Sequence, residues 1–270
     1  MNILYCGDQN IRTGVLLSVL SLAQQGSEPL HIYLLTASIS AKDTFFHAIQ
    51  KPFAEQLDAL VKSYDPDSFV LLFDLTMQFS ANPPTANLNT RFTPCCMLRL
   101  YADLIHQIPD RILYLDYDVL CRRDPAGFYH QPMADHELAG CRDYYGSHFF
   151  GRDYLNSGVL LLNMKQIRQT DLFGRCRILC RDKTMFLPDQ TAIHKLVTKK
   201  KICPNKYNEQ HALHEDTVLQ HFSTGFRFFP RFRTVSVKPW DIRGMHEVLH
   251  LHEYDELLKQ YQHIKKEFSL

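Results

Sequence analysis

Several short runs of this chain are apolar at almost every position, and this feature restricts the possible folds more than any other. The runs are Asn2 to Cys6, Leu30 to Leu35, Phe69 to Phe73 and Ile112 to Leu115. A strand with one face in water would alternate apolar and polar residues, whereas a strand buried on both faces is apolar throughout. We therefore predict a central sheet that is covered on both sides.

Segments with helical spacing of apolar residues alternate with these strands. We predict helices over Ile11 to Gln24, Ala41 to Tyr64 with a kink at Pro52, Thr93 to Ile108, Met164 to Leu179 and Asp189 to Val197. Shorter strands are predicted over Glu137 to Cys141, Gly158 to Asn163 and Lys201 to Pro204. This alternation is typical of an α/β protein with a mainly parallel sheet flanked by helices. Two irregular segments, Thr76 to Phe92 and Asp143 to Asp153, are long enough to be binding loops or lids.

Composition narrows the class of protein. The chain has 270 residues, of which 45% are hydrophobic and 22% charged, so it can form one large domain or two small ones. A net charge of +1 argues against a nucleic-acid partner. We expect no signal peptide and no membrane span, because the start lacks a basic segment before an apolar run and no window approaches about 20 apolar residues. Eight scattered cysteines without a C-x-x-C motif favour a reduced, cytoplasmic chain.

The stretch RILYLDYDVL, residues 111–120, runs an apolar strand directly into two carboxylates, Asp116 and Asp118. Ligands of open α/β sheets bind beyond the carboxyl ends of the strands. Residues i and i+2 of an extended chain point to one side, roughly 6.6 Å apart, and two carboxylates there repel unless a cation lies between them. Oxygen ligands suit Mg²⁺ or Mn²⁺, and such an ion could neutralise a diphosphate. The alternative is a strand-end Asp that caps the next turn.

A D-x-D motif after a strand serves at least two chemistries. In haloacid-dehalogenase-like phosphatases the first Asp attacks phosphorus, and Asp116 to Val119 satisfies that motif. That class also needs a downstream acidic pair, and the chain has no G-D-x-x-x-D and no adjacent Asp pair after Asp118. The other chemistry is glycosyl transfer from a nucleotide sugar. A nucleotide-sugar-binding protein without turnover is a third hypothesis.

Further motifs favour glycosyl transfer. In chain order they are ILYCGDQN (3–10), LRL (98–100), YLDYDV (114–119), YLNSGVLLLN (154–163), PDQ (188–190), YN (207–208), His221 and KPW (238–240). With these segments the chain resembles glycosyltransferase family 8, from residue 1 to about Trp240. The resemblance implies a GT-A fold and a retaining enzyme of the bacterial galactosyl- or glucosyltransferase kind. It also implies one catalytic domain over residues 1–245, with a nucleotide-binding half (1–120) and an acceptor and sugar half (121–245), followed by a helical tail (246–270).

The resemblance also implies roles for single residues. It implies donor binding by Asp8, Asn10, Arg99, Tyr117, Gly225 and Lys238, catalysis by Gln190, Asp189 and Asn156, and a metal, Mn²⁺ or Mg²⁺, held by Asp116, Asp118 and His221. Ordinary structural roles are the alternatives: a turn at Asp8 and Asn10, a paired Arg99, a turn before the strand at Asn156 and a helix cap at Asp189. Gln190 is no strong base or nucleophile, but its carbonyl can stabilise positive charge on the sugar. We therefore favour front-face substitution, in which the departing phosphate deprotonates the acceptor hydroxyl.

Three histidines compete for the role of third metal ligand. His221 follows the apolar residues Val218 and Leu219, so we expect it at a strand end that opens onto the cleft. His250 and His252 have H-x-H spacing, but they alternate with leucines in Val248 to His252, which predicts an edge strand with its histidines in water. The expected place of His221 at a strand end therefore favours it as the third metal ligand.

Two C-terminal features depart from a plain catalytic domain. Residues Phe226 to Val237 separate His221 from Lys238 and could shape the acceptor site or a partner surface, and Trp240 could belong to the core. The tail, Asp255 to Phe268, is amphipathic and could lie on a membrane surface, although packing on the domain is favoured.

Together these features predict a metal-dependent retaining hexosyltransferase in the cytoplasm, or at the inner face of the membrane. Its donor would be UDP-glucose or UDP-galactose and its acceptor a glycan, glycolipid or glycoprotein. The oligomeric state stays open.

Overall fold

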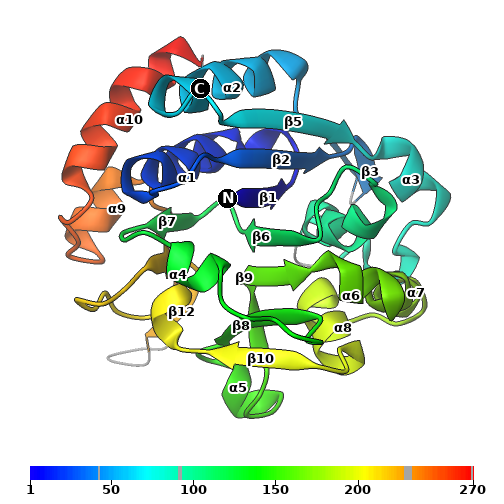
Figure 1. Cartoon of the computed structure of the whole chain (residues 1–270). Coiled ribbons are helices and arrows are strands. Elements are labelled where there is room, and N and C mark those ends of the chain that lie inside the picture. The colour runs from blue at the N-terminus through cyan, green and yellow to red at the C-terminus, as the bar shows by residue number, and fades with distance from the viewer. Residues whose placement is uncertain (42, 91–92, 228–232, 269) are drawn as a thin grey trace.

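A twisted seven-stranded sheet forms the centre of the molecule (Figure 1). The computed structural model describes residues 1–41, 43–90, 93–227, 233–268 and 270. In spatial order the strands are β10 (Lys200–Cys203), β8 (Leu138–Arg142), β9 (Leu155–Asn163), β6 (Arg111–Leu115), β1 (Asn2–Cys6), β2 (His31–Thr36) and β5 (Phe69–Asp74). Each strand predicted from an apolar run is present within a few residues of its predicted bounds.

Strand direction follows the predicted mixed, mainly parallel arrangement. Strands β5, β2, β1 and β6 are parallel to one another, and β8 is parallel to β10. Strand β9 runs antiparallel to both β6 and β8. The beginning of β9 therefore lies at the same edge of the sheet as the ends of β6 and β8.

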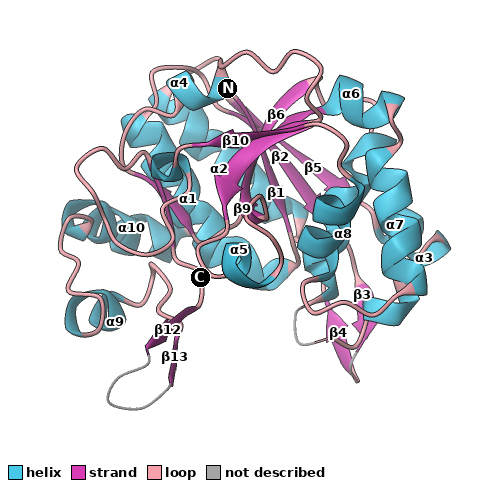
Figure 2. Ribbon diagram, turned by 90° about the horizontal axis from the view of Figure 1, so that it is seen from below, coloured by secondary structure: helices cyan, strands magenta, loops and turns pink. Residues whose placement is uncertain are grey.

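Helices cover both faces of the sheet, as the apolar strands predict (Figure 2). On one face lie α1 (Arg12–Gln25), α2 (Lys51–Tyr64) and α10 (Asp255–Glu267). On the other lie the 3₁₀ helix η3 (Pro94–Leu104) and helices α6 (Met164–Gln169), α7 (Leu172–Asp182) and α8 (Pro188–Leu196). The short helices α3 (Thr76–Ala81), α4 (Ala126–Tyr129) and α5 (Gly146–Phe149) lie in connections between the main elements. Each face has its own buried apolar cluster, so the sheet separates two cores.

Three predicted helices differ from the structure. The segment Ala41 to Tyr64 begins with two short strands, β3 (Ile39–Ala41) and β4 (Thr44–Phe46), and the helix starts only at Lys51. Pro52 lies in its first turn, where the missing N–H costs nothing, so it starts the helix rather than kinking it. The segment Thr93 to Ile108 forms 3₁₀ turns instead of an α-helix.

The third difference is a break in the segment Met164 to Leu179. Helix α6 ends at Gln169 and α7 begins at Leu172. Between them Asp171 adopts a left-handed conformation with φ of 52°, which no α-helix contains. The apolar spacing continues across the break because both helices pack on the same core, so the sequence pattern does not reveal the break.

Two small antiparallel pairs complete the fold. Strand β7 (Val119–Cys121) pairs with β11 (Leu219–His221), so that His221 lies opposite Val119. Strands β12 (Gly225–Arg227) and β13 (Arg233–Val235) form a hairpin that projects from the body in Figure 2. Apart from Gly225, the two strands lie within the segment Phe226 to Val237 that separates His221 from Lys238, of which residues 228–232 are outside the described part of the chain.

The tail packs on the domain. Leu257, Leu258 and Tyr261 of α10 are buried against the core that contains α1 and α2, and the Phe268 ring contacts Phe53 edge-on at 5.8 Å between centroids. The predicted edge strand over Val248 to His252 is wrong: these residues form an irregular connection between α9 (Ile242–Glu247) and α10. Among the described residues, no helix has the length and apolar character that a membrane span requires.

Candidate active site

Polar side chains gather at one edge of the sheet, where several strands end. Asp8 follows β1, Asp116 follows β6 and Asp143 follows β8, and these three strands run in one direction. Asn156 and Gly158 come from the beginning of β9, which runs the other way and so starts at this edge. The mixed topology thus brings together residues from the first and second halves of the chain.

Asp8, Asp116, Asp143 and Asn156 line a cavity of about 580 Å³, a size that suits a nucleotide sugar rather than a small ion alone. Ten of the twelve residues predicted for the site line it: Asp8, Asn10, Arg99, Asp116, Tyr117, Asp118, Asn156, Gln190, His221 and Lys238. The other two are Asp189, which is buried behind Arg99, and Gly225, which follows the lining residue Thr224 in β12.

The two carboxylates of the D-x-D motif are each paired with a cation of the protein. Asp116 accepts hydrogen bonds from Arg99 Nη2 at 3.0 Å and from the Tyr114 hydroxyl at 2.5 Å. Asp118, which is buried, accepts one from Lys238 Nζ, which also donates to the Phe222 carbonyl. The expectation that the pair repels without a metal ion is therefore too simple, because Arg99 and Lys238 already balance the two charges.

His221 completes a group of three possible metal ligands. Its Nε2 lies 3.3 Å from Asp118 Oδ1 and 3.7 Å from Asp116 Oδ2, and donor atoms of the three residues all lie within 4.8 Å of one another. The other ring nitrogen, Nδ1, faces Asn156 Oδ1 at 3.2 Å, which orients the imidazole.

Gly158 makes room for this group. A Cβ at this position would lie 2.2 Å from His221 Cε1 and 2.9 Å from Asp116 Oδ2, which is closer than real atoms approach. Only glycine therefore lets His221 lie against Asp116. Two carboxylates and one imidazole, brought together because Gly158 has no side chain, suit a divalent ion such as Mn²⁺ or Mg²⁺.

The protonation equilibria at this centre are strongly coupled. Burial alone would raise the pKa of Asp118, but His221 and Lys238 hold it well below its ordinary value. Burial alone would lower the pKa of His221, but Asp118 and Asp116 raise it above its ordinary value. When His221 is protonated, a metal ion must displace a proton from the imidazole, because only a neutral imidazole can be a ligand.

Asp8 and Asn10 form a compact polar unit at the start of the first helical turn. Asp8 accepts from the Asn10 backbone N–H at 3.1 Å and from Asn10 Nδ2 at 2.8 Å, so the predicted turn is present and still faces the cavity. Nearby, Tyr117 stacks on the half-buried Trp240 at 5.8 Å between ring centroids. The Tyr117 ring is therefore held in place by an aromatic partner.

Arg99 connects the D-x-D motif to α8. Its guanidinium lies 3.0 Å from Asp116 Oδ1 and 3.2 Å from Asp189 Oδ2, and it donates to the Ser157 carbonyl at 2.6 Å. It also lies over the Tyr114 ring at 3.9 Å. Burial raises the pKa of Asp189, and Arg99 opposes that shift. Arg99 is thus both a paired structural arginine and a cavity residue, which combines the two alternatives drawn from the sequence.

Asn156 and Gln190 meet at a carboxylate that the sequence did not single out. Asp143 Oδ2 accepts from Asn156 Nδ2 at 2.9 Å and from Gln190 Nε2 at 3.0 Å, while Gln190 Oε1 accepts from the Ser157 N–H and hydroxyl, both at 3.1 Å. Asp143 lines the cavity. The only sequence signal for it was its place at the start of an irregular segment after a strand.

Neither His250 nor His252 contributes to this cavity. His252 instead lies near His246 and Asp255, as described below. Of the three histidines weighed as ligands, only His221 reaches the D-x-D carboxylates.

Comparison with known proteins adds a family match. A model of the family described as glycosyl transferase family 8 matches residues 2–244. The probable glycosyl transferase Gly of Streptococcus gordonii is 33% identical over 91 residues, which are 33% of this chain and 13% of that protein. The glycosyltransferase GlyA of Streptococcus pneumoniae is 36% identical over 62 residues, 23% of this chain and 9% of that protein. The matched segments thus span only a small part of both relatives.

Solved structures share the fold along the whole chain. A galactosyltransferase, LgtC, solved in complex with donor and acceptor sugar analogues, matches with a TM-score of 0.70 at 18% identity and covers 96% of each chain. The glycosyltransferase GlyE of Streptococcus pneumoniae matches with a TM-score of 0.61 at 17% identity, over 96% of this chain and 63% of that one. At these identities the likeness establishes the fold.

Proposed function

The chain belongs to glycosyl transferase family 8, and from this membership we propose that it is a metal-dependent retaining hexosyltransferase. Its donor is UDP-glucose or UDP-galactose, and its acceptor is a glycan, a glycolipid or a glycoprotein. The fold is the GT-A fold. The single observation that carries the proposal is the group Asp116, Asp118 and His221 inside a cavity large enough for a nucleotide sugar.

The metal proposal rests on the donor set and on the close approach of His221 to Asp116 that Gly158 permits. Asp116, Asp118 and His221 would hold Mn²⁺ or Mg²⁺, and a bound ion would neutralise negative charge on the diphosphate leaving group. Lys238, which reaches Asp118 from the same cavity, is the protein cation that we assign to the diphosphate.

We assign the nucleoside to the side of the cavity that Asp8, Asn10 and Tyr117 line. Carboxylate and amide groups can pair with the uracil edge and the ribose hydroxyls, and Tyr117, supported by Trp240, offers a ring face to the base. Gly225 is kept as a donor-binding candidate through its neighbour Thr224, which lines the cavity.

We assign the sugar to the region between Arg99, Asn156 and Gln190. Arg99 supplies a charged group for the sugar hydroxyls, and Asp189, buried behind Arg99, would act by holding that guanidinium in place. Gln190 donates a hydrogen bond to the carboxylate of Asp143. The negative charge of this carboxylate can stabilise positive charge that develops on the anomeric carbon. Retention then follows from front-face substitution, in which the departing phosphate oxygen takes the proton of the acceptor hydroxyl.

The cytoplasm is the proposed compartment. All eight cysteines are free thiols, which suits a reducing environment. The apolar residues of α10 are buried against the domain, so contact with the inner face of a membrane would have to use other groups of the tail. The phosphatase hypothesis is not supported, because the chain belongs to a different family.

The test is a donor screen that needs no acceptor. The full chain is incubated with UDP-glucose, UDP-galactose and GDP-sugars, with Mn²⁺ or with a chelator, and released nucleotide is measured. We expect slow, metal-dependent release of UDP from one UDP-sugar and little release from the GDP-sugars. Tight binding of UDP-sugars without any release, even with cell-surface glycan extracts as acceptor, would instead indicate a binding protein without turnover.

The screen is repeated with Asp8→Ala. If Asp8 contributes to recognition of the uridine, the variant binds UDP more weakly than the wild type and loses its preference for UDP over GDP. Equal affinity of the wild-type chain for both nucleotides would remove that role from Asp8.

A further inference from the structure

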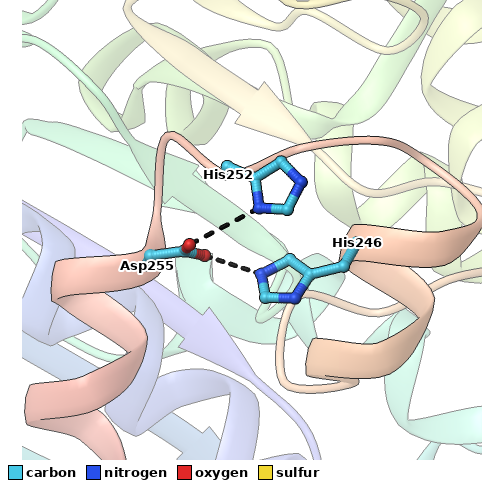
Figure 3. Close-up of side chains that lie close together, drawn as sticks. All are labelled: His246, His252 and Asp255. Atoms are coloured by element: carbon cyan, nitrogen blue, oxygen red, sulfur yellow. Dashed lines mark hydrogen bonds and ion pairs between the residues drawn. The ribbon is translucent and has the colours of Figure 1, made fainter.

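A second group of possible metal ligands lies outside the cavity, at the junction of α9 and α10 (Figure 3). His246 is in the last turn of α9, His252 is in the connection and Asp255 begins α10. Asp255 Oδ1 lies 2.7 Å from His246 Nε2, and Asp255 Oδ2 lies 3.5 Å from His252 Nδ1. The two imidazoles stack with their centroids 4.4 Å apart, and both turn a nitrogen toward the carboxylate, as Figure 3 shows.

The backbone holds this connection in a closed turn. Leu249 and Leu251 donate their N–H groups to the Gly244 and Met245 carbonyls at 3.1 and 3.0 Å, and Asp255 donates to the His252 carbonyl at 3.1 Å. His250 reverses the chain with φ of 55°, a left-handed conformation. His252 and Asp255 therefore return to the end of α9, where His246 lies.

The same connection is fixed to the domain from the inside. Tyr254, which lies between His252 and Asp255 in the sequence, is buried. It donates its hydroxyl to Gln220 Oε1 at 2.7 Å and packs edge-on against Phe222. His246, His252 and Asp255 are on the outward side, with side chains 33%, 65% and 37% exposed. The three donors are thus preorganised on the protein but remain accessible to an ion from solvent.

We propose that His246, His252 and Asp255 form a second metal site, which takes a divalent transition-metal ion of the zinc type. Two imidazoles and one carboxylate are donors that Zn²⁺ prefers, whereas the D-x-D group has two carboxylates and one imidazole and suits Mn²⁺ or Mg²⁺. Ligand bonds of roughly 2.0–2.2 Å in a tetrahedron separate the donors by roughly 3.3–3.6 Å. The two carboxylate–imidazole separations are 2.7 and 3.5 Å, and all three donor atoms lie within 4.8 Å of one another, so shifts of these partly exposed side chains can bring the donors to that spacing.

Binding would replace the hydrogen bonds of the metal-free group. Each imidazole then presents a lone pair instead of a proton to the centre, and water fills the fourth position. The ion would join the end of α9 to the start of α10 and so hold the tail on the domain. The three donors are brought together only in the folded chain, so an ion bound there raises the melting temperature.

The test uses the full chain without a polyhistidine tag, stripped of metal and then saturated with Mn²⁺ to occupy the D-x-D group. Because Zn²⁺ binds nitrogen and oxygen donors more tightly than Mn²⁺, the Mn²⁺ released during the titration is measured and subtracted from the Zn²⁺ taken up. Zn²⁺ is titrated against a chromophoric chelator, and melting curves are recorded with and without Zn²⁺. His252→Ala and Asp255→Asn are the variants, since both side chains are exposed and neither change disturbs the core. His250→Asn is the matched control, because it removes an imidazole from the same connection and Asn tolerates a left-handed conformation.

We expect one Zn²⁺ per chain in the wild type and in His250→Asn, with a rise in melting temperature in both. His252→Ala and Asp255→Asn should bind this ion at least about 10-fold more weakly and lose the rise. UDP binding by the two variants shows that they are folded. The proposal is overturned if the Mn²⁺-saturated wild type binds no Zn²⁺, or if both variants bind it as tightly as the wild type; the group would then be a hydrogen-bonded cluster only.

Discussion

At the scale of single residues, the acids of the cavity, of which Asp118 is buried, are tolerated because each has its own partner. Asp116 pairs with Arg99, Asp118 with Lys238, and Asp143 holds two side-chain amides. A buried carboxylate without such partners would cost several kcal/mol, on the order of the penalty known for unpaired buried ions. The arrangement also means that changing one acid leaves a cation without its partner.

The first prediction concerns Asp118. Replacing it with Asn removes a ligand, so the metal-dependent part of UDP binding should disappear and UDP release should fall by more than about 100-fold, since outer partners of a metal site alone are worth 10–100-fold. Stability should fall as well, because Lys238 loses its carboxylate. Calorimetric titration of Mn²⁺ with UDP measures the binding directly.

Glu137→Gln is the matched control for a lost buried charge. Glu137 is buried away from the cavity and accepts from the Thr198 and Lys199 N–H groups at 2.6 and 3.1 Å. This variant should lose about 1–3 kcal/mol of stability and keep its Mn²⁺ titration. If Asp118→Asn instead binds Mn²⁺ like the wild type, the ligand assignment is wrong.

The second prediction concerns Gln190, which bonds Ser157 through its carbonyl and Asp143 through its amide nitrogen. If it acts on the transition state, Gln190→Ala should lower kcat by about 100-fold and leave the donor KM nearly unchanged. Steady-state kinetics with the donor identified in the screen separates the two constants. An unchanged kcat with a raised KM would make Gln190 a binding residue.

At the scale of elements, the site depends on the direction of β9. Because β9 is antiparallel to β6, Gly158 lies beside Asp116, whose N–H it accepts at 2.7 Å through its carbonyl. The pair β7–β11 then brings His221 over the same glycine. Three elements from distant parts of the chain meet at one residue that has no side chain.

Gly158→Ala is therefore the third prediction. The added methyl group would lie 2.2 Å from His221 Cε1 and must displace the imidazole, so Mn²⁺ affinity in the presence of UDP should fall by roughly 10–100-fold. Gly127→Ala in α4 is the control, because a Cβ there meets nothing within 4 Å. Should Gly158→Ala keep wild-type Mn²⁺ affinity, His221 is not a ligand in this position.

At the scale of the whole molecule, the tail is part of the main core. Leu258 and Tyr261 of α10 are buried in the same apolar cluster as α1, α2 and one face of the sheet. A helix that buries its apolar face in a shared core unfolds with that core rather than separately. The tail is then a structural layer of the catalytic domain.

The fourth prediction follows from this packing. Leu258 is 2% exposed, so Leu258→Ala should lower the global free energy of unfolding by about 2–5 kcal/mol. Leu104→Ala, at a side chain 45% exposed, should change it by less than about 0.5 kcal/mol. Denaturant unfolding measures the change in free energy for both variants, and hydrogen exchange shows which elements lose protection. A loss confined to α10 would mean that the tail unfolds on its own.

The sequence by itself determined the parts of this protein that depend on local pattern. The strands Asn2–Cys6 and Arg111–Leu115, the helix Arg12–Gln25 and the position of the D-x-D motif after a strand were all predictable. Burial on both faces makes such strands apolar at successive positions, so the signal lies within a few neighbouring residues. Family motifs extended that signal to residues as distant as Gln190 and His221.

Only the tertiary structure decided what distant residues do to one another. Arg99 pairs with Asp116, and Lys238 pairs with Asp118. Asn156 and Gln190 both donate to Asp143. His252 lies with His246 and Asp255 rather than with His250. Apart from His252 with Asp255, which are three residues apart, none of these pairings has a regular spacing along the chain. Each pairing is set by strand direction and by how the helices pack on the sheet. Ion pairs and hydrogen bonds depend on a distance of a few ångströms in space, however many residues separate the partners along the chain.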